Sequence, residues 1–182
     1  LCDWSSDVCS SDLTWSQFPK LVDVKMTDLS VLDTLTEYID AGHVNFEEGR
    51  KELYRLSIAL ENYAVKHNVP LLATFETGER YKYVEDRYTE ILNQVPKAWI
   101  IGNFNNPLLA PQPPQSAEVI SCDGTNVSDM WIVLTRGPDG PFGLVAEEIG
   151  DGQYLGFFSY SPMIISNVIR NLSNKLRVVI DI

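Results

Sequence analysis

Apolar residues recur along the chain with two different spacings, and these spacings predict where helices and strands lie. Repeats of three or four residues indicate a helix with one apolar face, whereas a short continuous apolar run is typical of a buried strand. A short helix is expected over residues 30–40, with Gly42 placed to end it. A longer helix is expected over residues 45–68, because Asn45 followed by Glu48 is a capping signal at its start.

The middle of the chain alternates between strand and helix patterns. Residues 71–77 form an apolar run rich in strand formers, residues 84–95 carry a helical stripe that Pro96 stops, and residues 99–104 form a second buried strand. This order predicts a right-handed crossover between two parallel strands. Four prolines then mark residues 105–115 as a connecting loop.

Short apolar runs separated by turn sequences follow the loop. Strands are expected at residues 118–121, 131–135, 143–147 and 154–158. The turns between them are Asp123-Gly124, Pro138-Asp139-Gly140 and Asp151-Gly152. Because such turns favour antiparallel hairpins, the second half of the sheet is expected to be antiparallel.

The last helix is expected to begin at Ser161-Pro162, an N-cap followed by proline, and its apolar face requires a sheet to cover. The fold class predicted is therefore α/β, with a mixed β-sheet of about five to six strands. The sheet would have a parallel crossover in its first half, antiparallel hairpins in its second, and flanking helices.

Composition adds limits on function. The 182 residues are 45% hydrophobic and fit a single folded domain. A net charge of −11 disfavours attraction to phosphate backbones and anionic lipid, so no nucleic-acid partner is expected. No apolar run approaches the roughly 20 residues of a membrane span, and no secretory signal is visible, so no membrane association and a cytoplasmic location are expected.

The first 13 residues are unusual for a protein. The chain begins with Leu1, and Ser5-Ser6-Asp7 recurs as Ser10-Ser11-Asp12. This segment resembles translated sequencing-adapter DNA, so residues 1–13 are expected to be a non-native artefact. Without them, 14 basic and 22 acidic side chains give a net charge of −8, and Cys122 is the one cysteine left. Neither a disulfide nor a cysteine-ligated metal site is then expected.

The remaining chain divides into three parts by pattern. Residues 14–45 are expected to form a helical lead-in, and residues 46–175 the main domain. The apolar tail at residues 176–182 stops without a turn or polar end, which predicts a truncated C-terminus.

The usual signatures of catalysis are weak. His43 is expected in a loop between helices and His67 at a helix C-terminus, where the helix dipole stabilises a cation. The glycines around Asp151 join two predicted strands and open no helix, so they indicate a hairpin rather than a phosphate-binding loop. No catalytic residue, no metal site and no particular cofactor is predicted.

Candidate ligand-binding residues follow the strand at residues 71–77, because loops past the carboxyl ends of strands form the ligand crevice of open α/β sheets. These candidates are Phe75, Glu76, Arg80 and Tyr81. Further candidates on later strands are Trp131, Glu147 and Phe157, beside Phe158. The alternative for the aromatic residues is to fill the core, and for Glu76 and Arg80 to form an exposed ion pair.

From about Tyr54 to Leu172 the chain resembles the DICT sensory domain, a bacterial signalling module. The matching segments are Leu56–Tyr63, Leu71–Glu76, Glu79-Arg80-Tyr81, Trp99–Phe104, the Trp131 strand, Leu144–Glu147 and Gly156–Pro162. These segments form a scaffold pattern and carry no catalytic residue. The resemblance implies a signal-input role beside an output domain in cis or in trans, such as a diguanylate cyclase or a two-component protein.

Three hypotheses follow. The first is a sensory domain that binds a small-molecule ligand or a partner protein, and is not an enzyme. The second is an interaction scaffold with an apolar patch along Leu32, Leu35 and Ile39 or along the C-terminal tail. The third is a small acid/base enzyme that uses Glu76 or Glu147, and it requires a cleft with shifted pKa values. The oligomeric state is left open.

Overall fold

A computed structural model describes residues 13–15 and 17–182. The expected adapter-derived segment lies outside these residues except for Leu13, which is fully buried. None of the helices in the described part of the chain is long and apolar enough to cross a bilayer.

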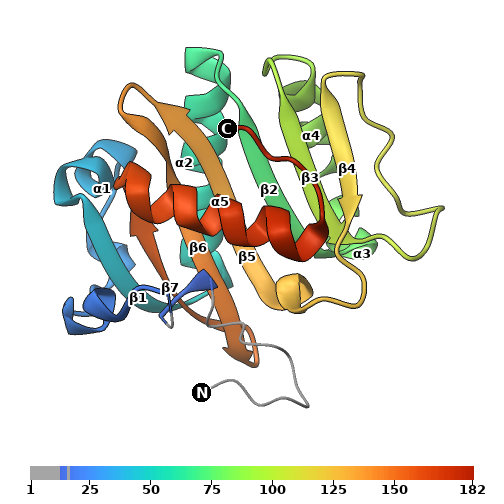
Figure 1. Cartoon of the computed structure of the whole chain (residues 1–182). Coiled ribbons are helices and arrows are strands. Elements are labelled where there is room, and N and C mark those ends of the chain that lie inside the picture. The colour runs from blue at the N-terminus through green and yellow to red at the C-terminus, as the bar shows by residue number, and fades with distance from the viewer. Residues whose placement is uncertain (1–12, 16) are drawn as a thin grey trace.

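A seven-stranded mixed sheet lies at the centre, with helices on both faces (Figure 1). The strands are β1 (His43–Gly49), β2 (Leu71–Thr77), β3 (Ala98–Asn103), β4 (Ala117–Ser121), β5 (Met130–Gly137), β6 (Gly140–Gly150) and β7 (Gln153–Ser159). Their order across the sheet is β1-β7-β6-β5-β2-β3-β4. The α/β class with a mixed sheet is confirmed, and the strand count is seven instead of five to six.

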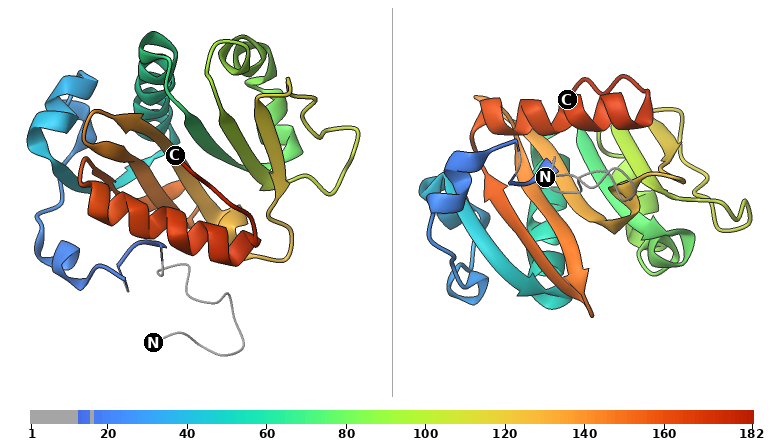
Figure 2. Two further views of the ribbon diagram at one scale, coloured as in Figure 1. Left: turned by 45° about the horizontal axis from the view of Figure 1, so that its top comes forward. Right: turned by 60° about the horizontal axis from the view of Figure 1, so that its bottom comes forward.

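The helices are α1 (Leu35–Ala41), α2 (Arg50–His67), α3 (Gly78–Lys82), α4 (Glu85–Leu92) and α5 (Pro162–Leu176). Short 3₁₀ turns are η2 (Pro19–Asp23), η3 (Leu29–Val31) and η4 (Asn126–Asp129). As Figures 1 and 2 show, α5 crosses one face of the sheet, whereas α2, α3 and α4 lie on the other. Each face has its own buried apolar cluster, so the sheet is covered on both sides.

The additional strand is β1, where a helix start was expected. Residues 43–49 pair antiparallel with β7, and α2 begins only at Arg50. The two side chains of the expected cap have other partners: the Asn45 amide donates to the carbonyls of Leu21 and Val24, and Glu48 accepts from the Leu29 amide. The helix prediction for 45–49 is therefore wrong, and His43 lies on a strand instead of in a loop.

The first helix also starts later than predicted. Thr34, not Ser30, caps α1 through a capping box with Glu37. Ser30 instead lies in η3, where its backbone amide donates to the Asp28 side chain. The predicted end at Gly42 is confirmed by its φ of 77°, a conformation that glycine adopts without strain.

Strand β4 corrects the hairpin prediction. The Asp123-Gly124 turn does not return the chain beside β4: β4 pairs parallel with β3 at the sheet edge, and β5 pairs antiparallel with β2. A turn sequence favours a change of direction but does not select the strand that pairs next. The parallel β2–β3 pair and the β5–β6–β7 meander, including the hairpin around Asp151, are confirmed.

Candidate functional site

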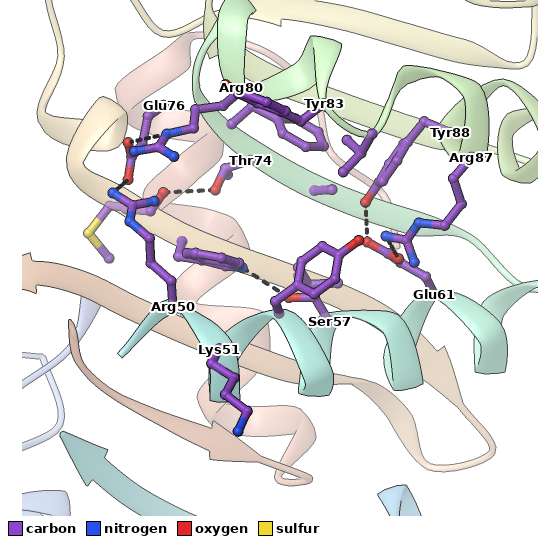
Figure 3. A pocket seen from close by; sticks show the side chains of 17 residues that line it. Arg50, Lys51, Ser57, Glu61, Thr74, Glu76, Arg80, Tyr83, Arg87 and Tyr88 are labelled. Carbon is purple, nitrogen blue, oxygen red and sulfur yellow. Dashed lines mark hydrogen bonds and ion pairs between the residues drawn. The ribbon is translucent and has the colours of Figure 1, made fainter. Parts of the chain in front are cut away.

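A cavity of about 380 Å³ opens on the face of the sheet that carries α2, α3 and α4 (Figure 3). Its floor lies where β2 and β5 separate, because their ladder has only three residue pairs, from Leu71 to Ala73 on β2. Beyond the ladder, the Thr74 hydroxyl accepts from the Ile132 amide and donates to the Met130 carbonyl, each at 2.9 Å. The Thr74 side chain thus holds the two strands together beneath the cavity.

The lining comes from the strands β2 and β5 and from two helical walls, one formed by α2 and the other by the α3–α4 segment. The residues are Arg50, Lys51, Tyr54, Ser57 and Glu61 of α2, Ala73, Thr74, Phe75 and Glu76 of β2, Arg80, Tyr83, Val84, Arg87 and Tyr88 of the α3–α4 segment, and Met130, Trp131 and Val133 of β5. Ala73 and Val133 are buried on the floor, whereas Tyr83 is 84% exposed. The cavity therefore has an apolar base and opens to solvent beside Tyr83.

At one end, three side chains converge on the Glu76 carboxylate. It accepts from Arg50 and from Arg80, each at 3.3 Å, and from the Tyr154 hydroxyl. Glu76 is the extra residue of a β-bulge, since Phe75 pairs with Gly102 and Thr77 with the next β3 residue. Burial, and then the hydrogen bond to Glu76, raise the pKa of Tyr154, so its hydroxyl remains a donor.

At the other end, Glu61 joins α2 to α4 (Figure 3). The Tyr88 hydroxyl donates to one carboxylate oxygen at 2.5 Å, and Arg87 forms an ion pair with the other. Burial raises the pKa of Glu61 although both partners oppose this shift, and burial also raises the pKa of Tyr88 well above its ordinary value. The Arg87 guanidinium carbon lies 5.6 Å from the ring centroid of Tyr54.

Trp131 lies between these two ends. Its indole nitrogen donates to the Ser57 hydroxyl at 2.9 Å, and that hydroxyl donates to the Leu53 carbonyl at 2.8 Å. The Trp131 ring is perpendicular to that of Tyr154, with centroids 5.4 Å apart. The indole is thus fixed in position and has an apolar surface in the cavity lining.

Four of the residues predicted from sequence meet in this cavity: Phe75, Glu76, Arg80 and Trp131. Tyr81 lies beneath it, buried, with its ring perpendicular to that of Phe75 at 5.2 Å. The ion pair between Glu76 and Arg80, which was the alternative to ligand binding for these residues, is present and forms part of the lining.

The other predicted residues lie away from the cavity. Phe157 belongs to the apolar cluster under α5, on the opposite face, whereas Phe158 packs against Tyr38. Glu147 accepts a hydrogen bond from the Thr14 hydroxyl at 3.4 Å, while Glu148 pairs with Arg50 on the cavity side. Adjacent strand residues point to opposite faces, so Glu147 and Glu76 do not share a site.

The α2 wall was missed by sequence reasoning. Arg50, Tyr54, Ser57 and Glu61 lie four, three and four residues apart, so they share one face of the helix, beside its apolar stripe. A polar and aromatic stripe of this kind on a half-buried helix was the available signal. Arg87 and Tyr88 on α4 had no comparable spacing signal.

Other reactive side chains lie outside the lining. His43 donates to Asn45 at 2.8 Å and burial lowers its pKa, whereas the exposed His67 ring lies 4.2 Å from that of Tyr63 at the end of α2. Burial raises the pKa of the Cys122 thiol to about 11. Within the described ranges, no three potential metal ligands gather at one point.

Comparison with known proteins gives no match to any family model, to any curated protein or to any solved structure. The geometry of the cavity is therefore the basis on which a function is assigned.

Proposed function

We propose that the chain is a signal-input domain that binds a small molecule in the cavity between α2 and the α3–α4 segment. The cavity itself is the observation that supports this function. Its volume of about 380 Å³ lies within the range of roughly 300–1,000 Å³ typical of ligand pockets. An apolar base with polar groups at two ends is the usual composition of such pockets.

The arrangement of the walls supports a sensory role. The segments that resemble the DICT domain supply Ser57, Glu61, Phe75, Glu76 and Arg80 to the lining. Glu61 connects α2 to α4, so a molecule that enters beside it acts on both helices at once. In this proposal the signal passes from these helices to an output domain, in cis or in trans, of the diguanylate cyclase or two-component kind, in the cytoplasm.

The acid/base alternative has less support. Glu76 is held by two arginines and a tyrosine, and Glu147 lies on the other face of the sheet. The scaffold alternative also has less support: Leu32, Leu35 and Ile39 are partly buried against one core cluster, and Ile180 of the tail is buried in the other, although Val179 of the tail is exposed. Ligand binding is the function that the cavity supports best.

A thermal-shift screen against metabolites and chromophores tests the proposal, because a ligand selective for the folded state raises the melting temperature by mass action. Replacing Tyr83 by alanine removes a lining side chain that is exposed, so the fold is expected to survive. We expect the shift given by a binding compound to fall in Tyr83→Ala, with no turnover of that compound.

The matched control is Met163→Ala, which removes an exposed side chain from α5 on the opposite face. This variant is expected to keep the full shift. A screen without any stabilising compound, or an equal loss in both variants, would contradict a ligand site in this cavity.

A further inference from the structure

Positive charge is concentrated in the cavity lining of an otherwise acidic protein. Four of the 14 basic side chains of the chain line it, namely Arg50, Lys51, Arg80 and Arg87. Only two carboxylates, Glu61 and Glu76, line the same space, whereas the whole chain has a net charge of −11. The local balance is opposite in sign to that of the molecule, and it favours an anion over a cation.

The two carboxylates do not neutralise this excess. Glu76 is shared between Arg50 and Arg80, and Glu61 pairs with Arg87. Lys51 forms no ion pair with any residue in the described ranges, but its side chain points away from the cavity (Figure 3). Glu148 next to the cavity pairs with Arg50 and also accepts a hydrogen bond from the Gly152 amide. Arg80 has a single carboxylate contact, through Nε, so its terminal nitrogens are available to a further acceptor.

The same carboxylates are poor sites for a cationic ligand. Both oxygens of Glu61 are occupied, one by the Tyr88 hydroxyl and one by Arg87. Both oxygens of Glu76 are occupied as well, by arginine and tyrosine donors. A cation would have to displace these donors, which include all three guanidinium groups of the lining.

The space between the charged ends suits an apolar body. The indole of Trp131, the Phe75 ring and the side chains of Ala73 and Val133 form the surface there. Aromatic rings pack well against such a surface in offset or edge-to-face contact. A volume of about 380 Å³ is sufficient for one or two rings.

We infer that the ligand is an organic anion, in which a one- or two-ring apolar body carries a carboxylate or a phosphate. The body packs on Trp131 and Phe75, and the anionic group binds Arg80. This inference rests on the proposed ligand-binding function and specifies its ligand class.

A series of compounds that differ only in charge tests it. Indole-3-acetate, indole-3-acetamide and tryptamine share one ring system and carry a negative, neutral or positive group. The corresponding acid, amide and amine of a phenyl and of a naphthyl body extend the series, with phenyl phosphate as the phosphate arm. We expect thermal shift and titration calorimetry at constant ionic strength to rank acids and phosphate above amides, and amides above amines, for every body that binds.

Two variants on α3, one of an arginine and one of a lysine, locate the anionic group. Arg80→Gln removes a cation of the lining, whereas Lys82→Gln removes one that pairs with Glu85 outside it. For the bound acid we expect about tenfold weaker binding in Arg80→Gln, the usual effect of losing a charged hydrogen bond, and no change in Lys82→Gln. The matching amide should bind equally to all three proteins.

The outcomes separate this inference from the proposed function. If amides or amines bind at least as well as the acids, the cavity binds ligands but the anionic class is wrong. If the acids bind best and the two variants weaken their binding equally, a general electrostatic attraction explains the preference and the specific role of Arg80 is wrong. If no compound of the series or of the wider screen binds, the ligand-binding function fails first.

Discussion

Glu61 is the more buried of the two carboxyl groups that line the cavity, with only 2% of its surface exposed. Two influences on it oppose each other: burial disfavours the carboxylate form, while the Tyr88 hydroxyl and the Arg87 guanidinium stabilise it. Burial is the larger influence, so the pKa of Glu61 in the folded protein lies above its ordinary value of 4.5.

This shift has a consequence for stability. Above pH 4.5 the unfolded chain releases the Glu61 proton, whereas the folded chain keeps it until its own higher pKa is reached. The folded state then holds more protons, so the free energy of unfolding falls as pH rises through this window. Below pH 4.5 the contribution is fully present.

We therefore expect the stability of the protein to decrease from pH 4.5 towards neutrality relative to that of Glu61→Gln. Urea unfolding of both proteins across this range measures the difference in their free energies of unfolding. Contributions from groups that titrate alike in both proteins cancel in that difference. A difference that grows in favour of the native protein with rising pH would mean that Arg87 outweighs burial.

At the residue scale, the sequence predicted part of the site for identifiable reasons. Phe75, Glu76 and Arg80 follow a strand whose carboxyl end was evident from its apolar run, so their place near a crevice could be inferred. Glu61 could not be inferred in the same way, because its isolation from water depends on Tyr88 and Arg87 of a helix more than 20 residues away.

At the element scale, β1 shows where local signals are insufficient. Asn45 and Glu48 have the spacing of a helix cap, yet their side chains bind backbone groups of residues 21–29. The Val44 and Phe46 side chains then fill the core beneath α1 and α2. A sequence pattern reports what a segment can form alone, whereas the neighbouring strand β7 decided the outcome here.

The β6–β7 pair depends on a glycine. A Cβ atom on Gly156 would lie 2.2 Å from the Val145 carbonyl oxygen and 2.6 Å from the Ala146 Cα, both on the backbone of β6. We expect Gly156→Ala to lower the free energy of unfolding by about 1–3 kcal/mol or more, because the strands must move apart.

Gly49→Ala is the matched control, since a Cβ there meets the Gln153 side-chain nitrogen at 3.5 Å and the Gly152 carbonyl oxygen at 4.0 Å, both ordinary contacts, and the backbone is not left-handed. It should change stability by less than about 1 kcal/mol. Denaturant unfolding of the two variants makes the comparison. Equal effects would show that the close approach of β6 and β7 carries no energetic weight.

At the scale of the whole molecule, the site arises from a change in topology at β2. This strand pairs parallel with β3 on one side and antiparallel with β5 on the other. The chain places α3 and α4 after β2 and places α2 before it, so two helical walls flank the strand and a cavity remains between them (Figures 1 and 3).

The apolar pattern predicted most of the elements, though not β1 or α3, and it did not predict this arrangement. Strand order depends on which edges meet in three dimensions, and the Asp123-Gly124 turn suggested a hairpin where the chain in fact crosses to β2. The cavity could therefore be placed near β2 from the sequence, while its second wall, α2, could not.

Hydrogen exchange with and without a stabilising compound tests the central claim most directly. A ligand between the two walls should slow exchange in residues 50–61 and 78–88 and leave α5 on the opposite face unchanged. Protection confined to α5, or the absence of protection in both walls at saturating ligand, would contradict a binding site in this cavity.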